Sequence, residues 1–169
     1  MSSSFDDVGV LAALAKALRD LRFSAIVVGN VASILHDVPV LTTDVDLLVR
    51  DTMANRQKTE RLAEVLGGTT EPILEQPGER GRPGRYDGLR IYNPIVPVDV
   101  LFRIAGVTFD AVRARARSKE VGGQRLTVAS LADVIRSKEA AGREKDLAAL
   151  PILRTTLAAQ RALKRKRIA

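Results

Sequence analysis

Short apolar runs alternate along this chain with segments of helical periodicity, and this alternation restricts the fold to a sheet packed against helices. Apolar side chains recur at helical spacing over residues 7–21, which predicts an amphipathic helix. A strand is predicted next, over residues 23–28. Residues 25–28 are apolar at every position, a pattern typical of a strand that is covered on both faces of its sheet.

The remaining segments continue the alternation. Strands are predicted over residues 44–49, 89–92, 96–102 and 125–128, and helices over residues 31–36, 54–66, 108–116, from 130 onward and 144–165. The strands near positions 90 and 98 are too close in sequence for a parallel crossover, so they predict an antiparallel hairpin. The predicted class is therefore α/β (α+β), a mixed β-sheet flanked by helices, with further helices at the C-terminus.

We expect one compact domain, made of a core over residues 1–129 and a C-terminal helical segment over residues 130–169 that packs on it and carries a basic tail. Residues 71–87 predict a loop with no more than a short strand near positions 73 and 74, because prolines and glycines interrupt them. Three arginines lie in this loop: Arg80, Arg82 and Arg85. Pro151 predicts a kink in the last helix.

The chain has no cysteine and one histidine, His36, among its 169 residues. Disulfides, cysteine zinc sites and cysteine nucleophiles are thereby excluded, and a metal ion must be bound by oxygen ligands. The first seven residues are acidic where a signal peptide would be basic, and the apolar runs fall short of the roughly 20 residues that cross a bilayer. We expect a cytoplasmic protein with no membrane partner.

The positive charge is concentrated near the C-terminus. The formal net charge is +7, but residues 1–146 carry only +1, because six lysines and arginines and no acidic residue follow Asp146. Two interpretations stay open: the basic tail is a solvated helix end, or it contacts the phosphates of a nucleic acid. The second interpretation predicts an RNA or tRNA partner whose affinity falls steeply with salt.

Three aspartates interrupt apolar strands. Asp44 and Asp46 are two positions apart on one strand, so their side chains leave the same face roughly 6.5–7 Å apart. Asp99 lies inside the apolar run of a later strand. If these strands are neighbours, the three carboxylates converge and favour Mg²⁺ (or Mn²⁺), which binds oxygen ligands. The alternative is structural: Asp44 caps a turn, and Asp46 pairs with Arg50 or Arg103.

These residues resemble the nucleotidyltransferase superfamily of DNA polymerase β, over about residues 22–146. The family pattern is an apolar strand followed by Gly-Gly or Gly-Ser, then Asp-x-Asp or Asp-x-Glu, then an aspartate on a later strand. This chain has Gly29 and Asn30, then Asp44 and Asp46, then Asp99. The resemblance implies the nucleotidyltransferase fold and the transfer of a nucleoside monophosphate from an NTP. It also implies that the three aspartates are catalytic metal ligands, with Asp99 as third ligand and base, and that Gly29 and Asn30 bind the nucleotide.

Residues 137–147 are similar to the lysine and aspartate motifs of the abortive-infection nucleotidyltransferase toxins of type IV toxin and antitoxin systems. This similarity implies nucleotide binding by Lys138 and Asp146, and a cognate antitoxin as partner. Lys138 also stands where the apolar stripe of its helix, at positions 131, 134 and 135, requires a core residue. We expect its side chain to point into the protein or a cleft, as a triphosphate ligand, or else to extend along the helix to its end.

Asn30 stands where the family has its second Gly or Ser, and it is also a candidate N-cap for the helix predicted over residues 31–36. Two hypotheses of function follow. The first is an active, metal-dependent nucleotidyltransferase that uses an RNA or tRNA end as the favoured acceptor, with a protein or a small molecule as alternatives. The second is a protein that keeps the fold, has lost catalysis through Asn30, and binds nucleic acid or regulates a partner. The three aspartates favour the first.

Overall fold

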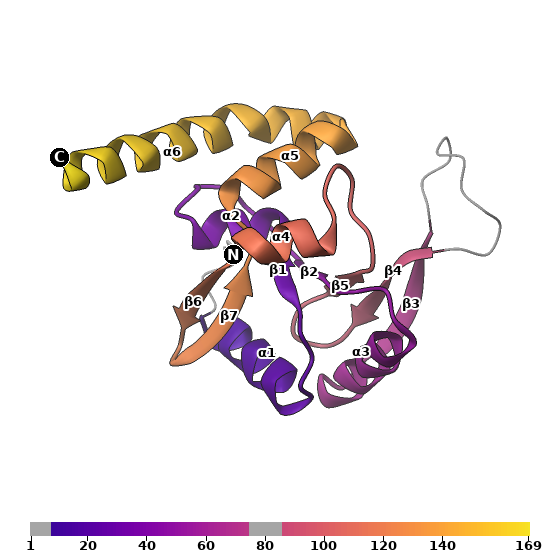
Figure 1. The fold of residues 1–169 in the computed structure, drawn as a ribbon. Helices are drawn as coiled ribbons and strands as arrows, with labels where there is room; N and C mark the ends of the chain where they lie inside the picture. The colour runs from indigo at the N-terminus through magenta and orange to yellow at the C-terminus, as the bar shows by residue number, and fades with distance from the viewer. Residues whose placement is uncertain (1–7, 75–85) are drawn as a thin grey trace.

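The computed structural model describes residues 8–74 and 86–169, and its centre is a mixed sheet of seven strands (Figure 1). In sheet order the strands are β3 (Thr69–Leu74), β4 (Tyr86–Tyr92), β5 (Val98–Leu101), β2 (Val45–Leu48), β1 (Ile26–Val28), β7 (Gln124–Val128) and β6 (Arg117–Val121). β1 pairs antiparallel with β2 and parallel with β7, while β2 pairs parallel with β5. Since both directions occur in one sheet, the predicted α/β class with a mixed sheet is confirmed.

Helices surround this sheet. In the described residues they are α1 (Val8–Asp20), α2 (Gly29–Leu35), α3 (Met53–Val65), α4 (Phe109–Arg115), α5 (Leu131–Ala141) and α6 (Glu144–Ile168). α1 and α3 lie on one side of the molecule, and α5 and α6 lie on the other (Figure 1). Thr52, Thr108 and Ser130 cap α3, α4 and α5, because each hydroxyl accepts a hydrogen bond from the backbone N–H three residues later. No helix in the described residues is long and apolar enough to span a membrane.

The central strands are buried on both faces, as the apolar pattern of residues 25–28 predicts. Ile26 and Val27 of β1 are buried, and so are Leu47 and Leu48 of β2. Burial of successive residues, which point to opposite faces, requires cover on both sides of the sheet. An aspartate in these strands is therefore surrounded by apolar side chains and needs a specific partner.

Two strands depart from the prediction. The apolar pattern does not predict β6, because its residues are mostly charged and exposed, as suits an edge strand, and it joins β7 in a tight turn through Gly122 and Gly123. β3 covers six residues, although the prolines and glycines predict a loop that begins inside it; the strand accommodates Pro72 because it forms the other edge of the sheet. The arginines of the predicted loop, Arg80, Arg82 and Arg85, lie outside the described residues.

α6 is one helix of 25 residues that contains Pro151, so the expected kink does not divide it. The helix packs on α5, and Gln160 donates a hydrogen bond of 2.7 Å to the backbone carbonyl of His36. Residues 161–169 are all exposed, and the end of α6 extends past the rest of the molecule in Figure 1. The basic tail is thus exposed, which agrees with both interpretations of it. The predicted division of the chain at residue 129 stays a prediction.

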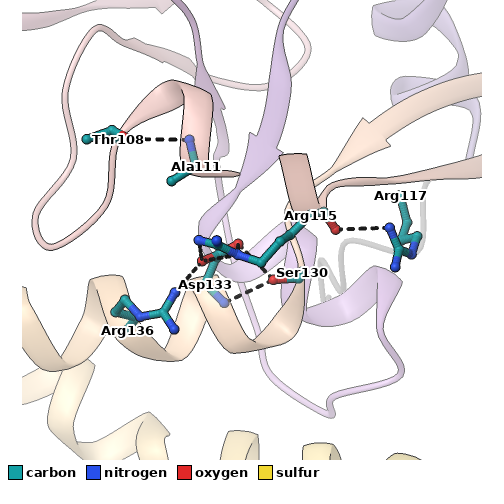
Figure 2. Close-up of polar contacts among 7 residues, drawn as sticks. All are labelled: Thr108, Ala111, Arg115, Arg117, Ser130, Asp133 and Arg136. Atoms are coloured by element: carbon teal, nitrogen blue, oxygen red, sulfur yellow. Dashed lines mark hydrogen bonds and ion pairs between the residues drawn. The ribbon is translucent and has the colours of Figure 1, made fainter. Parts of the chain in front are cut away.

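A buried carboxylate holds the start of α5 against the end of α4 (Figure 2). The Asp133 side chain is 1% exposed and accepts hydrogen bonds from Arg115 at 2.6 and 2.9 Å and from Arg136 at 2.7 Å. Burial acts to raise the pKa of Asp133, but the hydrogen bonds from Arg115 and Ser130 hold it below its ordinary value. The bonds from Arg115 fix the position of α5, which carries Lys138, relative to α4.

Candidate active site

The three aspartates predicted from the strand patterns come together at one place. Asp46 of β2 lies opposite Asp99 of β5 in the parallel register, and Asp44 directly precedes β2. Carboxylate oxygens of the three residues all lie within 4.8 Å of one another. The convergence expected for neighbouring strands is therefore confirmed.

The carboxylates affect one another electrostatically. The pKa of Asp46 is raised to about 7, by loss of hydration on burial first and then by the charges of Asp44 and Asp99. The charges of Lys138 and Lys145 oppose this rise. Carboxylates this close repel one another when ionised, so a cation placed between them would stabilise the cluster.

Arg90 of β4 supplies part of that positive charge, and the sequence patterns did not predict it. Its guanidinium binds Asp99 through two hydrogen bonds of 2.6 Å and lies 3.5 Å from a carboxylate oxygen of Asp44. The hydrogen bond to Asp99 raises the pKa of Arg90. The predicted hairpin makes the two strands neighbours, but only the register observed between β4 and β5 sets Arg90 across from Asp99. Arg50, considered above as a partner of Asp46, pairs with Asp110 instead, at 2.6 Å.

Gly29 brings the backbone against the carboxylates. Its φ is +65°, and a Cβ built on it would lie 2.3 Å from Oδ2 of Asp46. A side chain has no room there, and residues other than glycine rarely adopt this φ. This chain therefore requires glycine at position 29, because Asp46 of the neighbouring strand β2 lies too close for any side chain.

Asn30 is not the N-cap of α2, so that prediction is wrong. The helix begins at Gly29, because the glycine turns the chain directly after Val28, and Asn30 already lies in the first turn. Nδ2 of Asn30 donates a hydrogen bond of 3.2 Å to the carbonyl of Leu41, while Oδ1 is buried without a partner among the described residues. A buried acceptor without a hydrogen-bond partner lowers the stability of the fold by roughly 1–3 kcal/mol.

Comparison with solved structures identifies the fold. No family model and no curated protein matches the chain in sequence. The solution structure of the antibiotic-resistance factor ANT(2'')-Ia aligns with a TM-score of 0.65 at 16% identity, over 98% of this chain and 94% of that chain. The crystal structure of ANT(2'')-Ia in complex with adenylyl-2''-tobramycin gives 0.63 at 17% identity, over 96% and 98%. An antigenic nucleotidyltransferase-like protein from Paracoccidioides brasiliensis gives 0.54 at 18% identity, over 92% and 78%.

The chain has the nucleotidyltransferase fold. The fold expected from the resemblance is therefore confirmed, and the coverage includes the C-terminal helices. At these identities the likeness establishes the fold alone. The similarity of residues 137–147 to abortive-infection toxins stays a prediction.

In this nucleotidyltransferase fold, α5 and α6 bring Lys138 beside Asp146. Nζ of Lys138 lies 3.3 Å from Oδ1 of Asp146, and the lysine side chain is 13% exposed, so it points into the protein as the apolar stripe predicts. Arg143 binds the other oxygen of Asp146 at 2.5 Å, which leaves that carboxylate 2% exposed. The predicted contact between Asp146 and the nucleotide stays a prediction. In the structure, the buried carboxylate of Asp146 holds the side chain of Lys138 in place.

The aspartate cluster fits a divalent cation. Carboxylate oxygens are the ligands that Mg²⁺ and Mn²⁺ prefer. Bonds of about 2.1 Å allow two ligands of one ion to be at most about 4.2 Å apart. Oxygens that lie within 4.8 Å of one another therefore need only a small side-chain movement to bind the same ion. Each oxygen of Asp99 keeps a lone pair after its hydrogen bond to Arg90. Asp44, Asp46 and Asp99 would hold the ion.

Arg90→Ala is expected to destabilise the metal-free protein by roughly 1–3 kcal/mol, because Asp99 then stays buried without its cation. Stabilisation by millimolar Mg²⁺ should become larger, since the ion replaces the missing positive charge. Urea unfolding in EDTA and in Mg²⁺ measures both effects. Arg50→Ala is the matched control: it removes a two-bond ion pair with exposed Asp110 and should have little effect. A Mg²⁺ response that is the same in Arg90→Ala and wild type would contradict this account.

Proposed function

We propose that this protein is a divalent-metal-dependent nucleotidyltransferase. The observation that carries the proposal is the approach of the Asp44, Asp46 and Asp99 carboxylates to within 4.8 Å of one another, on the sheet of this fold. A bound Mg²⁺ or Mn²⁺ would neutralise charge on the phosphates and align the attacking and leaving oxygens. In the transfer, an acceptor oxygen bonds to the α-phosphorus of an NTP while the bond to pyrophosphate breaks.

Each side chain of the site has a role in this proposal. Asp44 and Asp46 hold the metal, and Asp99 is the third ligand and the base that takes the proton of the acceptor hydroxyl. Arg90 orients the carboxylate of Asp99 through its two hydrogen bonds. Because Arg90 leaves lone pairs on both oxygens, Asp99 keeps the capacity to bind metal or a proton.

Lys138 is the proposed ligand of the triphosphate, together with Gly29 and Asn30 at the start of α2. Its charge acts on Asp46, so it lies within electrostatic reach of the aspartates. Asp146 acts through Lys138, because Asp146 is buried and Arg143 holds its second oxygen.

Lys138→Ala should weaken NTP binding roughly 10- to 100-fold, which corresponds to a charge-assisted hydrogen bond of roughly 1.5–3 kcal/mol. The fold should persist, since Arg143 remains as a partner of Asp146. Isothermal titration of both proteins with each NTP measures the loss. Lys164→Ala, which removes an exposed lysine of α6, is the control for charge alone. Equal affinity in Lys138→Ala and wild type would remove Lys138 from the site.

The proposed acceptor is an RNA or tRNA end. Six positive charges follow Asp146, and most of them lie on the exposed end of α6, where they suit a polyanion. A complex of ANT(2'')-Ia holds adenylyl-2''-tobramycin, which makes a small-molecule acceptor the second candidate. The similarity of residues 137–147 to type IV toxins supports a toxin role with a cognate antitoxin.

Incubation with each labelled NTP, Mg²⁺ and total RNA tests the proposed function. Label recovered in the RNA fraction supports transfer to RNA, and label in protein or small molecules would change the acceptor. Asp46→Asn protein is the control for contaminating transferases. No label in any fraction, together with NTP binding by titration, would favour the alternative of a nucleic-acid-binding or regulatory protein with an impaired site.

A further inference from the structure

A cavity of about 320 Å³ lies away from the aspartates. Residues 22–25, which lead into β1, form one wall, whereas Gly29 and Asp46 lie at the other end of that strand. α1, α4 and β7 supply the remaining walls. Four arginines line the cavity, and no described aspartate or glutamate does: Arg19, Arg22, Arg113 and Arg125. We call it the arginine cavity.

Neutral groups hold two of these arginines in place. Arg113 donates a hydrogen bond of 2.8 Å to the hydroxyl of Ser24, and Arg19 donates one of 2.8 Å to the side-chain carbonyl of Gln124. Arg19 also lies 3.4 Å from Asp20, at the exposed end of α1. A neutral partner orients a guanidinium without cancelling its charge, so the contacts with Ser24 and Gln124 keep these two arginines available to an anion.

Arg22 stands at a backbone position that favours glycine. Its φ is +49°, directly after α1. The N–H of Arg22 donates to the carbonyl of Arg19 at 2.9 Å, and the N–H of Phe23 donates to that of Leu18 at 2.8 Å. These two bonds form the Schellman motif, in which the left-handed residue is usually glycine because a Cβ is disfavoured there.

α3 ends in the same motif, with Gly67 at the left-handed position and a φ of +69°. The left-handed residue is therefore glycine after α3 and arginine after α1. Within the described residues, the side chains of Arg22 and Arg125 form no hydrogen bond or ion pair. Arg22 thus strains the backbone without stabilising the fold through its side chain, which indicates a role toward a ligand.

We propose that the arginine cavity binds the phosphodiester backbone of RNA. Guanidinium groups match phosphate oxygens with paired hydrogen bonds. All four arginines are exposed, which suits a polynucleotide that stays partly in solvent, whereas a small ligand is usually enclosed. Phe23, the one aromatic residue of the lining, is 4% exposed and cannot stack on a base. Recognition is therefore of phosphate, without preference for sequence.

This inference deepens the proposed function and rests on it only in taking RNA as the acceptor. The cavity lies apart from the metal ligands, so RNA binding there requires neither metal nor NTP. A protein that binds RNA through the cavity but transfers no nucleotide would overturn the proposed function alone.

The test is fluorescence anisotropy with a labelled single-stranded RNA of mixed sequence, in EDTA and without NTP, at several KCl concentrations. Arg22→Gly with Arg125→Ala should lower the affinity roughly 10-fold at low salt. The slope of log K against log salt should become less steep by ~1.4, at about 0.7 for each phosphate that the variant no longer neutralises. Arg61→Ala, an exposed arginine of α3 outside the cavity, should change neither.

Arg22→Gly separates binding from folding. Its melting temperature should equal or exceed that of wild type, because glycine suits the left-handed position, while its RNA affinity falls. Wild-type affinity and slope in the double variant would overturn the proposal.

Discussion

Asp46→Asn is expected to reduce nucleotidyl transfer by more than about 100-fold. Loss of an outer partner that merely orients a metal ligand costs about 10–100-fold, so loss of a charged ligand should cost more. Asp46 lies opposite Asp99 in the register and two residues from Asp44, so it is central to the cluster. Asparagine keeps the size of the side chain and one oxygen, so the packing against Gly29 is retained.

The same substitution should separate metal binding from folding. In EDTA the variant should be as stable as wild type or more stable, because a neutral amide is not repelled by Asp44 and Asp99. The rise in melting temperature that Mg²⁺ gives wild type should be lost. Asp110→Asn is the control, since it neutralises an exposed aspartate outside the site. Equal Mg²⁺ stabilisation of Asp46→Asn and wild type would show that the aspartates bind no metal.

Gly29→Ala is expected to destabilise the protein by roughly 2–5 kcal/mol. The left-handed φ of +65° accounts for roughly 1–2 kcal/mol of this. The new Cβ would lie 2.3 Å from Oδ2 of Asp46, and relieving that overlap adds about 1–3 kcal/mol. Because the carboxylate must move, transfer activity and the Mg²⁺ response should fall as well.

Gly67→Ala provides a matched control for the backbone. Gly67 has a φ of +69°, and nothing lies within 4 Å of a Cβ built on it, so its substitution should cost only the roughly 1–2 kcal/mol of the left-handed conformation. Urea unfolding of both variants isolates the contact with Asp46 as the difference between them. If the two substitutions destabilise the protein equally, Asp46 does not restrict the residue at position 29.

Local patterns in the sequence determined the elements and the aspartates of the site. Residues 26–28 of the apolar run are buried on both faces of the sheet, because neighbouring residues in any strand point to opposite faces. The same period of two sets Asp44 and Asp46 on one face, whatever the rest of the chain does. The helical period likewise directs Lys138 inward, where its side chain is found 13% exposed.

Tertiary structure alone decided which groups meet across the sheet. Arg90 binds Asp99 because of the register between β4 and β5, and Gly29 is required by a carboxylate of another strand. Asn30 lost its predicted role as N-cap because the turn at Gly29 begins the helix before it. The arginine cavity likewise joins segments about a hundred residues apart. Propensity and periodicity act over one helical turn or strand, whereas these contacts depend on the packing of whole elements, which no local pattern encodes.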